Sequence, residues 1–204
     1  MRLVCKVDAM ASCDPRNWFP GAVCAGSFAA VFLAWCLTEV LYARLGRDRR
    51  RTVCDRGSYL VGMISVHSGV AAGVTLRALG WGAVSMIVQC AGVLVMALGI
   101  ALRFWAIRRL GRHFSVRVAI QPEHRLVTDG PYRWLRHPCY TGTLLTVMGV
   151  PTALGIWLLA PVVGVLFVAG HSYRIHVEEQ ALVKIFGGEY HAYCRRTWRI
   201  VPGW

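Results

Sequence analysis

The stretch "YTGTLLTVMGVPTALGIWLLAPVVGVLFVAGHSY", residues 140–173, decides how this chain folds, because it contains no Lys, Arg, Asp or Glu. As a single helix rising 1.5 Å per residue it would be about 51 Å long, whereas the hydrocarbon core of a bilayer is about 30 Å thick. Pro151, Gly155 and Pro161 interrupt the stretch near its middle. We therefore expect a hairpin of two helices, at about 140–152 and 156–176.

Three further apolar segments precede this hairpin, at about 19–43, 59–76 and 82–102. A transmembrane helix needs roughly 20 apolar residues, and the second segment is the shortest of the three. The composition agrees, with 56% hydrophobic and 16% charged residues and a mean hydropathy of +0.47. We predict an all-α, polytopic integral membrane protein with five transmembrane helices, forming a single domain over residues 1–204.

The basic residues predict the orientation of these helices. Segments 44–56, 103–139 and 174–204 carry six, eight and five of the 23 Lys and Arg residues. By the positive-inside rule these segments are cytoplasmic, so both ends of 140–173 lie on the same side and the hairpin is required. The N-terminus is then outside, and the C-terminus inside. Because topology and anionic lipids account for the net charge of +13, we expect no nucleic-acid partner.

The eight cysteines do not indicate a metal site. No two of them have the C-x-x-C spacing, and several lie in or beside apolar segments, so neither zinc binding nor a disulfide framework is expected. A pairing of Cys5 with Cys13 stays open. The first residues lack a continuous apolar core ahead of a cleavage site, so they do not resemble a cleaved signal peptide.

Polar side chains converge where the hairpin meets the predicted cytoplasmic face. One group is "RHPCY", residues 136–140, and the other is Arg174 with Glu178, which are four residues apart and share a helix face. Basic anchors, interfacial aromatics and a local ion pair would explain these residues one by one. Together they favour a functional site, since ionisable groups at membrane depth are usually functional. Beyond the last span we expect a helix at about 172–186, a stop at Gly187-Gly188 and a second helix at about 189–197.

Two motifs give the chain a family resemblance. "HRLVTDGPYRWLRHPCYTG" (124–142) and "EEQALVKIFGGEYHAYCRRTWRIVP" (178–202) resemble the isoprenylcysteine carboxyl methyltransferase family and the related phospholipid methyltransferases. The resemblance covers about 108–202. It implies an S-adenosylmethionine-dependent enzyme that methylates a lipophilic substrate, in the first place the carboxylate of a prenylcysteine-like compound.

The resemblance also implies roles for particular residues, in a cofactor-binding region at about 112–142 and 174–202. The residues that would enclose the methyl donor are His124, Arg125, Leu126, Val127, Tyr132, His137, Pro138, Cys139, Tyr140 and Glu178. Arg174 would bind the substrate carboxylate, and Arg174 and Glu178 would be the catalytic pair. Some family members have a Gln seven residues before the first His, whereas this chain has Arg117.

The residue types suit that chemistry. A carboxylate can accept hydrogen bonds from ribose hydroxyls or favour a sulfonium cation, and a helix N-terminus suits a carboxylate group. A substrate carboxylate is already ionised near neutral pH, so no general base is needed. The donor would arrive from water and the substrate sideways from the bilayer, with membrane lipids as the other partners. Two alternatives stay open: an NADPH-dependent membrane sterol-type reductase, and a non-catalytic membrane adaptor or transporter.

Overall fold

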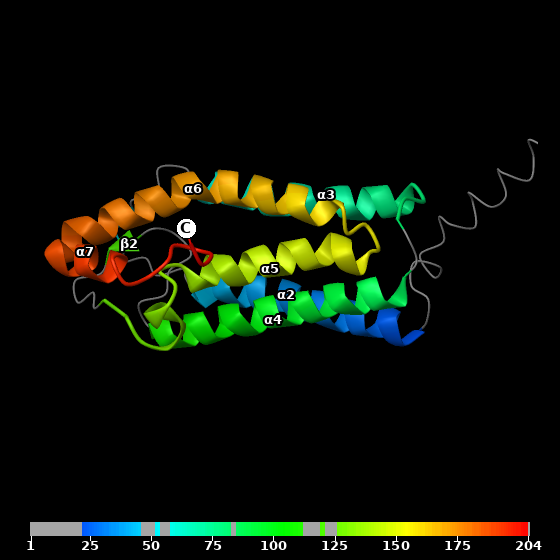
Figure 1. Cartoon of the computed structure of the whole chain (residues 1–204), viewed down its shortest axis with the longest axis horizontal. Coiled ribbons are helices and arrows are strands. Elements are labelled where there is room, and N and C mark those ends of the chain that lie inside the picture. The colour runs from blue at the N-terminus through cyan, green and yellow to red at the C-terminus, as the bar shows by residue number, and fades with distance from the viewer. Residues whose placement is uncertain are drawn as a thin grey trace, which may run out of the picture.

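The computed structural model describes residues 22–45, 52–53, 58–82, 85–111, 119–120 and 126–203. Within these residues, five long helices lie side by side in an elongated bundle (Figure 1). They are α2 (Ala22–Leu45), α3 (Ser58–Ala78), α4 (Met86–Leu110), α5 (Pro138–Ala153) and α6 (Leu159–Phe186). Shorter elements are the 3₁₀ helix η3 (Gly130–Arg133), the helix α7 (Gly188–Cys194) and an antiparallel pair of two-residue strands, β1 (Thr52–Val53) and β2 (Ala119–Ile120). The predicted helical architecture is confirmed.

The predicted break inside 140–173 is present. Helix α5 ends at Ala153 and α6 begins at Leu159, and Gly155 between them has a φ of 81°. Figure 1 shows α6 returning alongside α5. Pro151 is accommodated inside α5, so the turn follows the proline and uses the glycine, which adopts a left-handed conformation at little steric cost.

The prediction for the segment after the last span needs correction. The predicted span at 156–176 and the predicted helix at 172–186 overlap, and they form one helix, α6, which ends at Phe186 as expected. The stop at Gly187 is confirmed: its φ is 51° and its amide donates to the carbonyl oxygen of Val183. Helix α7 then ends at Cys194 rather than near 197. The apolar and polar parts of α6 therefore form one continuous helix that extends from the bundle into the polar end.

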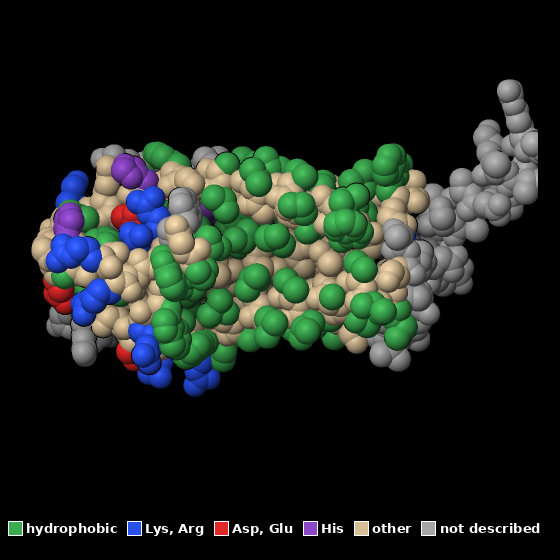
Figure 2. Space-filling view, viewed as in Figure 1, with side chains coloured by type: hydrophobic (Ala, Val, Ile, Leu, Met, Phe, Trp, Pro, Cys, Tyr) green, Lys and Arg blue, Asp and Glu red, His purple; other side chains and the backbone are tan. Residues whose placement is uncertain are grey.

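The surface of the bundle suits lipid. Figure 2 shows hydrophobic side chains over the body of the molecule, while Lys, Arg, Asp, Glu and His gather at the end that holds α7. Large apolar side chains such as Leu37, Ile87 and Val165 are mostly exposed, as lipid-facing residues are and as soluble surfaces rarely are. Among the described helices, α4 (Met86–Leu110) alone is both long and apolar enough to cross a membrane by composition. Within α2, Gly26–Leu41 forms a shorter apolar stretch.

Glycines bring α4 and α5 into direct backbone contact. A Cβ atom on Gly99 would lie 2.6 Å from the carbonyl oxygen of Gly142, and a Cβ on Gly142 would lie 2.6 Å from that of Gly99. Small residues at such positions allow close helix packing where the hydrophobic effect contributes little. This contact is one turn into α5, so it fixes the beginning of that helix and the polar residues around it.

Candidate functional site

Main-chain hydrogen bonds hold the segment before α5 against the C-terminal segment. The amide of Arg136 donates to the carbonyl oxygen of Trp198 at 2.7 Å, and the amide of His137 donates to that of Arg199 at 3.0 Å. His137 is the N-cap residue of α5 and Pro138 occupies its first turn, where the missing N–H of proline has no cost. The chain near its C-terminus therefore positions the start of α5.

Tyr140 connects the two polar groups that the sequence singles out. Its hydroxyl accepts a hydrogen bond from Nε of Arg174 at 2.8 Å and donates one to Oε2 of Glu178 at 2.8 Å. The prediction that Arg174 and Glu178 share a helix face is confirmed, and a side chain from α5 lies between them. This bridge fixes the orientation of the buried guanidinium and of one carboxylate oxygen.

His137 lies between two adjacent carboxylates of α6. Its Nδ1 is 3.9 Å from Oε2 of Glu178, and its Nε2 is 3.4 Å from Oε1 of Glu179. The side chain of Glu178 is 33% exposed, whereas those of His137 and Glu179 are 3% and 10% exposed. Glu178 is thus the more exposed of the two acids.

Glu179 is ionised despite its burial. Its carboxylate accepts from Nη1 of Arg136 at 3.0 Å and from Nη2 of Arg199 at 2.8 Å. Burial alone would raise the pKa of Glu179, but the hydrogen bond and the charge of His137, the hydrogen bond of Arg199 and the charge of Arg136 outweigh it and lower the pKa to about 2. Two arginines and a histidine from other parts of the chain therefore meet on this carboxylate.

Tyr132 and Cys139 form a second, less polar wall. The Tyr132 hydroxyl is 3.5 Å from Sγ of Cys139, and the Tyr132 carbonyl oxygen accepts a hydrogen bond from the Tyr193 hydroxyl at 2.7 Å. Burial raises the pKa of the Cys139 thiol to about 11. Cys139 is therefore a neutral thiol near neutral pH and unsuited to act as a nucleophile.

The structure gathers most of the predicted site residues. Those that lie together around the start of α5 and the polar part of α6 are Tyr132, His137, Pro138, Cys139, Tyr140, Arg174 and Glu178. Leu126 and Val127 precede η3 and are half-buried. His124 and Arg125 lie outside the described residues.

Some residues of this cluster received no role from the sequence. Arg199 begins the terminal R-x-x-P pattern, and that motif was the available signal for its contact with Glu179. Arg103 donates to Glu39 of α2 at 3.2 Å and also to the hydroxyl of Thr143. Its position at the end of an apolar segment resembles an ordinary basic anchor, so no sequence signal distinguishes it.

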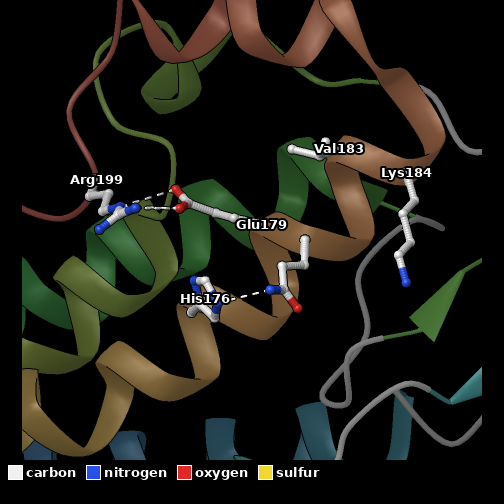
Figure 3. Close-up of a pocket in the computed structure, with 6 residues that line it drawn as sticks. His176, Glu179, Val183, Lys184 and Arg199 are labelled. Atoms are coloured by element: carbon white, nitrogen blue, oxygen red, sulfur yellow. Dashed lines mark hydrogen bonds and ion pairs between the residues drawn. The ribbon is translucent and has the colours of Figure 1, made fainter.

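A groove runs beside the cluster on the polar part of α6 (Figure 3). Its volume is about 640 Å³, and it is lined by His176, Glu179, Gln180, Val183, Lys184 and Arg199. Figure 3 shows Arg199 reaching across from the C-terminal segment to Glu179. Within the described residues, no group of three or more His, Cys, Asp or Glu side chains is arranged to hold a metal ion.

Comparisons with known proteins agree with the motifs. Residues 91–184 match the model of the isoprenylcysteine carboxyl methyltransferase (ICMT) family. A probable protein-S-isoprenylcysteine O-methyltransferase of Oryza sativa subsp. indica is 31% identical over 117 residues, which cover 56% of this chain and 61% of that protein. The protein-S-isoprenylcysteine O-methyltransferase of Schizosaccharomyces pombe is 34% identical over 109 residues, covering 52% of this chain and 46% of that protein.

A solved structure is similar as well. The eukaryotic intramembrane Ras methyltransferase ICMT aligns with a TM-score of 0.54 and 27% identity, over 72% of this chain and 53% of that one. The chain spans about half the length of the relatives it matches. The resemblance predicted from the motifs is confirmed, and so is the helical membrane architecture.

Proposed function

We propose, from the match of residues 91–184 to the ICMT family, that this chain is an S-adenosylmethionine-dependent methyltransferase of the membrane. Its substrate would be lipophilic, with the carboxylate of a prenylcysteine-like compound as the methyl acceptor. The observation that carries the proposal is the bridge from Arg174 through Tyr140 to Glu178, which joins the proposed substrate-binding and donor-binding groups at adjoining positions.

The residues present fit the methyl donor. Glu178 is partly exposed, and Oε2 takes the contact with Tyr140, so the carboxylate can also accept from ribose hydroxyls or favour a cation. His137 stands at the N-terminus of the 16-residue helix α5, where the helix dipole favours an anionic group such as the methionine carboxylate. We assign donor binding to Tyr132, His137, Pro138, Cys139, Tyr140 and Glu178, with Leu126 and Val127 beside them. His124 and Arg125 complete the assignment on the resemblance alone.

When bound, S-adenosylmethionine supplies an activated methyl group on its sulfonium. The protein's task is then to align an acceptor with that group, since alignment supplies much of the catalysis of an in-line displacement. Arg174 is suited to orient a substrate carboxylate, because Tyr140 fixes its guanidinium and a guanidinium can bind a carboxylate bidentately. The acceptor is already ionised near neutral pH, so no residue needs to remove a proton.

We further propose five membrane crossings, with the site at the cytoplasmic face. The apolar body and the charged end of the molecule support this arrangement. The spans would lie within α2, α3, α4, α5 and α6, with the last two as a hairpin, the N-terminus outside and the C-terminus inside. On a background without the native cysteines, Trp81→Cys should react with a membrane-impermeant thiol reagent in intact cells, whereas Glu189→Cys should react only after lysis. The opposite pattern would reverse the orientation.

The donor is tested by thermal stabilisation in detergent. S-adenosylmethionine and its demethylated product should both raise the melting temperature, and NADPH should not. Stabilisation by NADPH without an effect of either sulfur compound would favour a sterol-type reductase. No saturable binding of any of these would favour an adaptor or transporter.

A further inference from the structure

Glu178 and Glu179 are neighbours in the sequence with opposite surroundings. Glu178 is one-third exposed and shares Oε2 with Tyr140. Glu179 is buried, and its two oxygens accept from Arg136, His137 and Arg199. A carboxylate has about four acceptor positions in total. Those of Glu179 are occupied by the protein, so this acid has no acceptor position left for a ligand, although it lines the groove.

The contact with His137 has a chemical consequence. An ionised carboxylate can only accept hydrogen bonds, so the imidazole nitrogen facing Glu179, Nε2, carries a proton. The hydrogen bond of one ring nitrogen sets the role of the other. Nδ1 of His137 therefore faces Glu178 and the exposed part of the site in a defined direction.

The same carboxylate anchors the segment Trp198–Ile200, which we call the C-terminal strap. Trp198 and the loop before α5 exchange main-chain hydrogen bonds, and the hydroxyl of Thr141 donates to the carbonyl oxygen of Ile200 at 2.6 Å. Nη2 of Arg199, which belongs to this strap, lies 2.8 Å from Oε2 of Glu179. Three segments far apart in the sequence thus meet at one buried charge.

We propose that Glu179 is a positioning residue, which keeps Nε2 of His137 protonated and fastens the C-terminal strap against the start of α5. The proposal deepens the proposed function, because the donor site is the one that His137 lines. The low pKa of Glu179 agrees with this role, because its carboxylate stays ionised throughout the physiological pH range.

The first test needs no methyl donor. Protein with ¹⁵N-labelled histidines in detergent should give a His137 signal of the Nε2–H form with a direct coupling to the Nε2 proton, assigned by its loss in His137→Gln. In Glu179→Gln that signal should shift or divide between tautomers, while in Glu178→Gln it should stay as in the wild type. A mixed His137 tautomer in the wild type would overturn the proposal.

The second test separates positioning from direct binding. Glu179→Gln should weaken binding of S-adenosylhomocysteine about tenfold, and Arg199→Gln should weaken it less, since Arg136 and His137 stay on the carboxylate. Glu179→Asp keeps the charge on a shorter side chain and should recover part of the affinity. Loss of donor affinity in Glu179→Gln with an unchanged His137 signal would show that Glu179 does not act through His137.

The outcomes separate a failure of this positioning role from a failure of the proposed methyltransferase function. If the wild type binds no donor, the proposed function fails, and the tautomer measurement still decides the role of Glu179. If the wild type binds the donor and Glu179→Gln binds it equally well with the same His137 signal, the positioning role fails alone. Should Glu179→Gln not fold, Arg199→Gln and the wild-type signal still test the proposal.

Discussion

The lipid-facing helices and the polar end of α5 and α6 are built on different principles. Along α2 and α3 large apolar side chains point outward, with Leu37 68% exposed and Ile64 59% exposed. At the polar end, charged groups are buried and saturate one another: Glu179 alone joins Arg136, His137 and Arg199. The first region should therefore tolerate substitutions that keep the side chain hydrophobic. In the second region, removing one polar side chain leaves its buried partner without a hydrogen bond.

The contact between α4 and α5 should show the largest effect. Gly99→Leu would place side-chain atoms where the Gly142 carbonyl and the α5 backbone lie, so we expect a loss of about 3 kcal/mol or more in stability. Gly26→Leu is the matched control, because nothing lies within 4 Å of a Cβ there. Thermal unfolding in detergent compares the two. Equal melting temperatures would mean that the helices do not approach as closely as described.

Glu178→Gln should have the next largest effect, on donor binding. The substitution removes the negative charge from the exposed acid of the pair while Gln can still accept from Tyr140. We expect affinity for S-adenosylhomocysteine to fall about ten- to hundredfold, or about 1.5–3 kcal/mol. Isothermal titration calorimetry measures this affinity. Unchanged affinity with an intact fold would remove Glu178 from the donor site.

Arg174→Lys should weaken binding of the substrate rather than binding of the donor. Lysine keeps the charge but lacks the planar fork, so the KM for a carboxylate substrate should rise about tenfold. Donor affinity should change little. If this variant loses donor affinity and treats every accepted substrate as the wild type does, the substrate role assigned to Arg174 is wrong.

The buried acid gives the polar end a distinct response to pH. Because the pKa of Glu179 is lowered from 4.5 to about 2, its contribution to stability is complete above pH 4.5 and is lost as the pH falls toward 2. The difference in melting temperature between the wild type and Glu179→Gln should therefore be constant from pH 5 to 7 and shrink below 4.5. A difference that grows in acid would contradict the assigned charge state.

The smallest effect is expected on the lipid-facing side. Leu37→Ala and Val165→Ala remove side chains that are mostly exposed, so each should change stability by less than about 0.5 kcal/mol. Melting temperatures in lipid nanodiscs would check this. A loss comparable to that of a buried core residue such as Phe167→Ala would mean that another protein surface covers the site.

The sequence predicted the features that depend on composition and spacing. The break in 140–173 follows from its length and from Gly155, and the gathering of His137, Tyr140, Arg174 and Glu178 follows from a turn that brings both ends of the hairpin to one level. It predicted the end of α6 at 186 correctly but placed the end of α7 near 197 rather than at Cys194, because no Gly or Pro marks that end.

The sequence carried only a weak signal for the partners of Glu179, the terminal R-x-x-P pattern that begins at Arg199. Glu178 and Glu179 are chemically identical, and their roles differ because a helix turns by about 100° per residue, so that only one of them faces the C-terminal strap. Arg199 is 20 residues from Glu179 along the chain, and the strap that carries it is placed by main-chain hydrogen bonds. Such contacts leave little trace in a single sequence.

Transfer of a tritiated methyl group from S-adenosylmethionine to a prenylated cysteine analogue with a free carboxylate tests the central claim most directly. The wild type should form a product that releases its label as methanol in mild alkali, as a methyl ester does. Glu178→Gln should need about ten- to hundredfold more donor for the same rate, and the analogue with an amidated carboxyl group should stay unlabelled. No transfer, or a label that resists alkali, would contradict carboxyl methylation by this site.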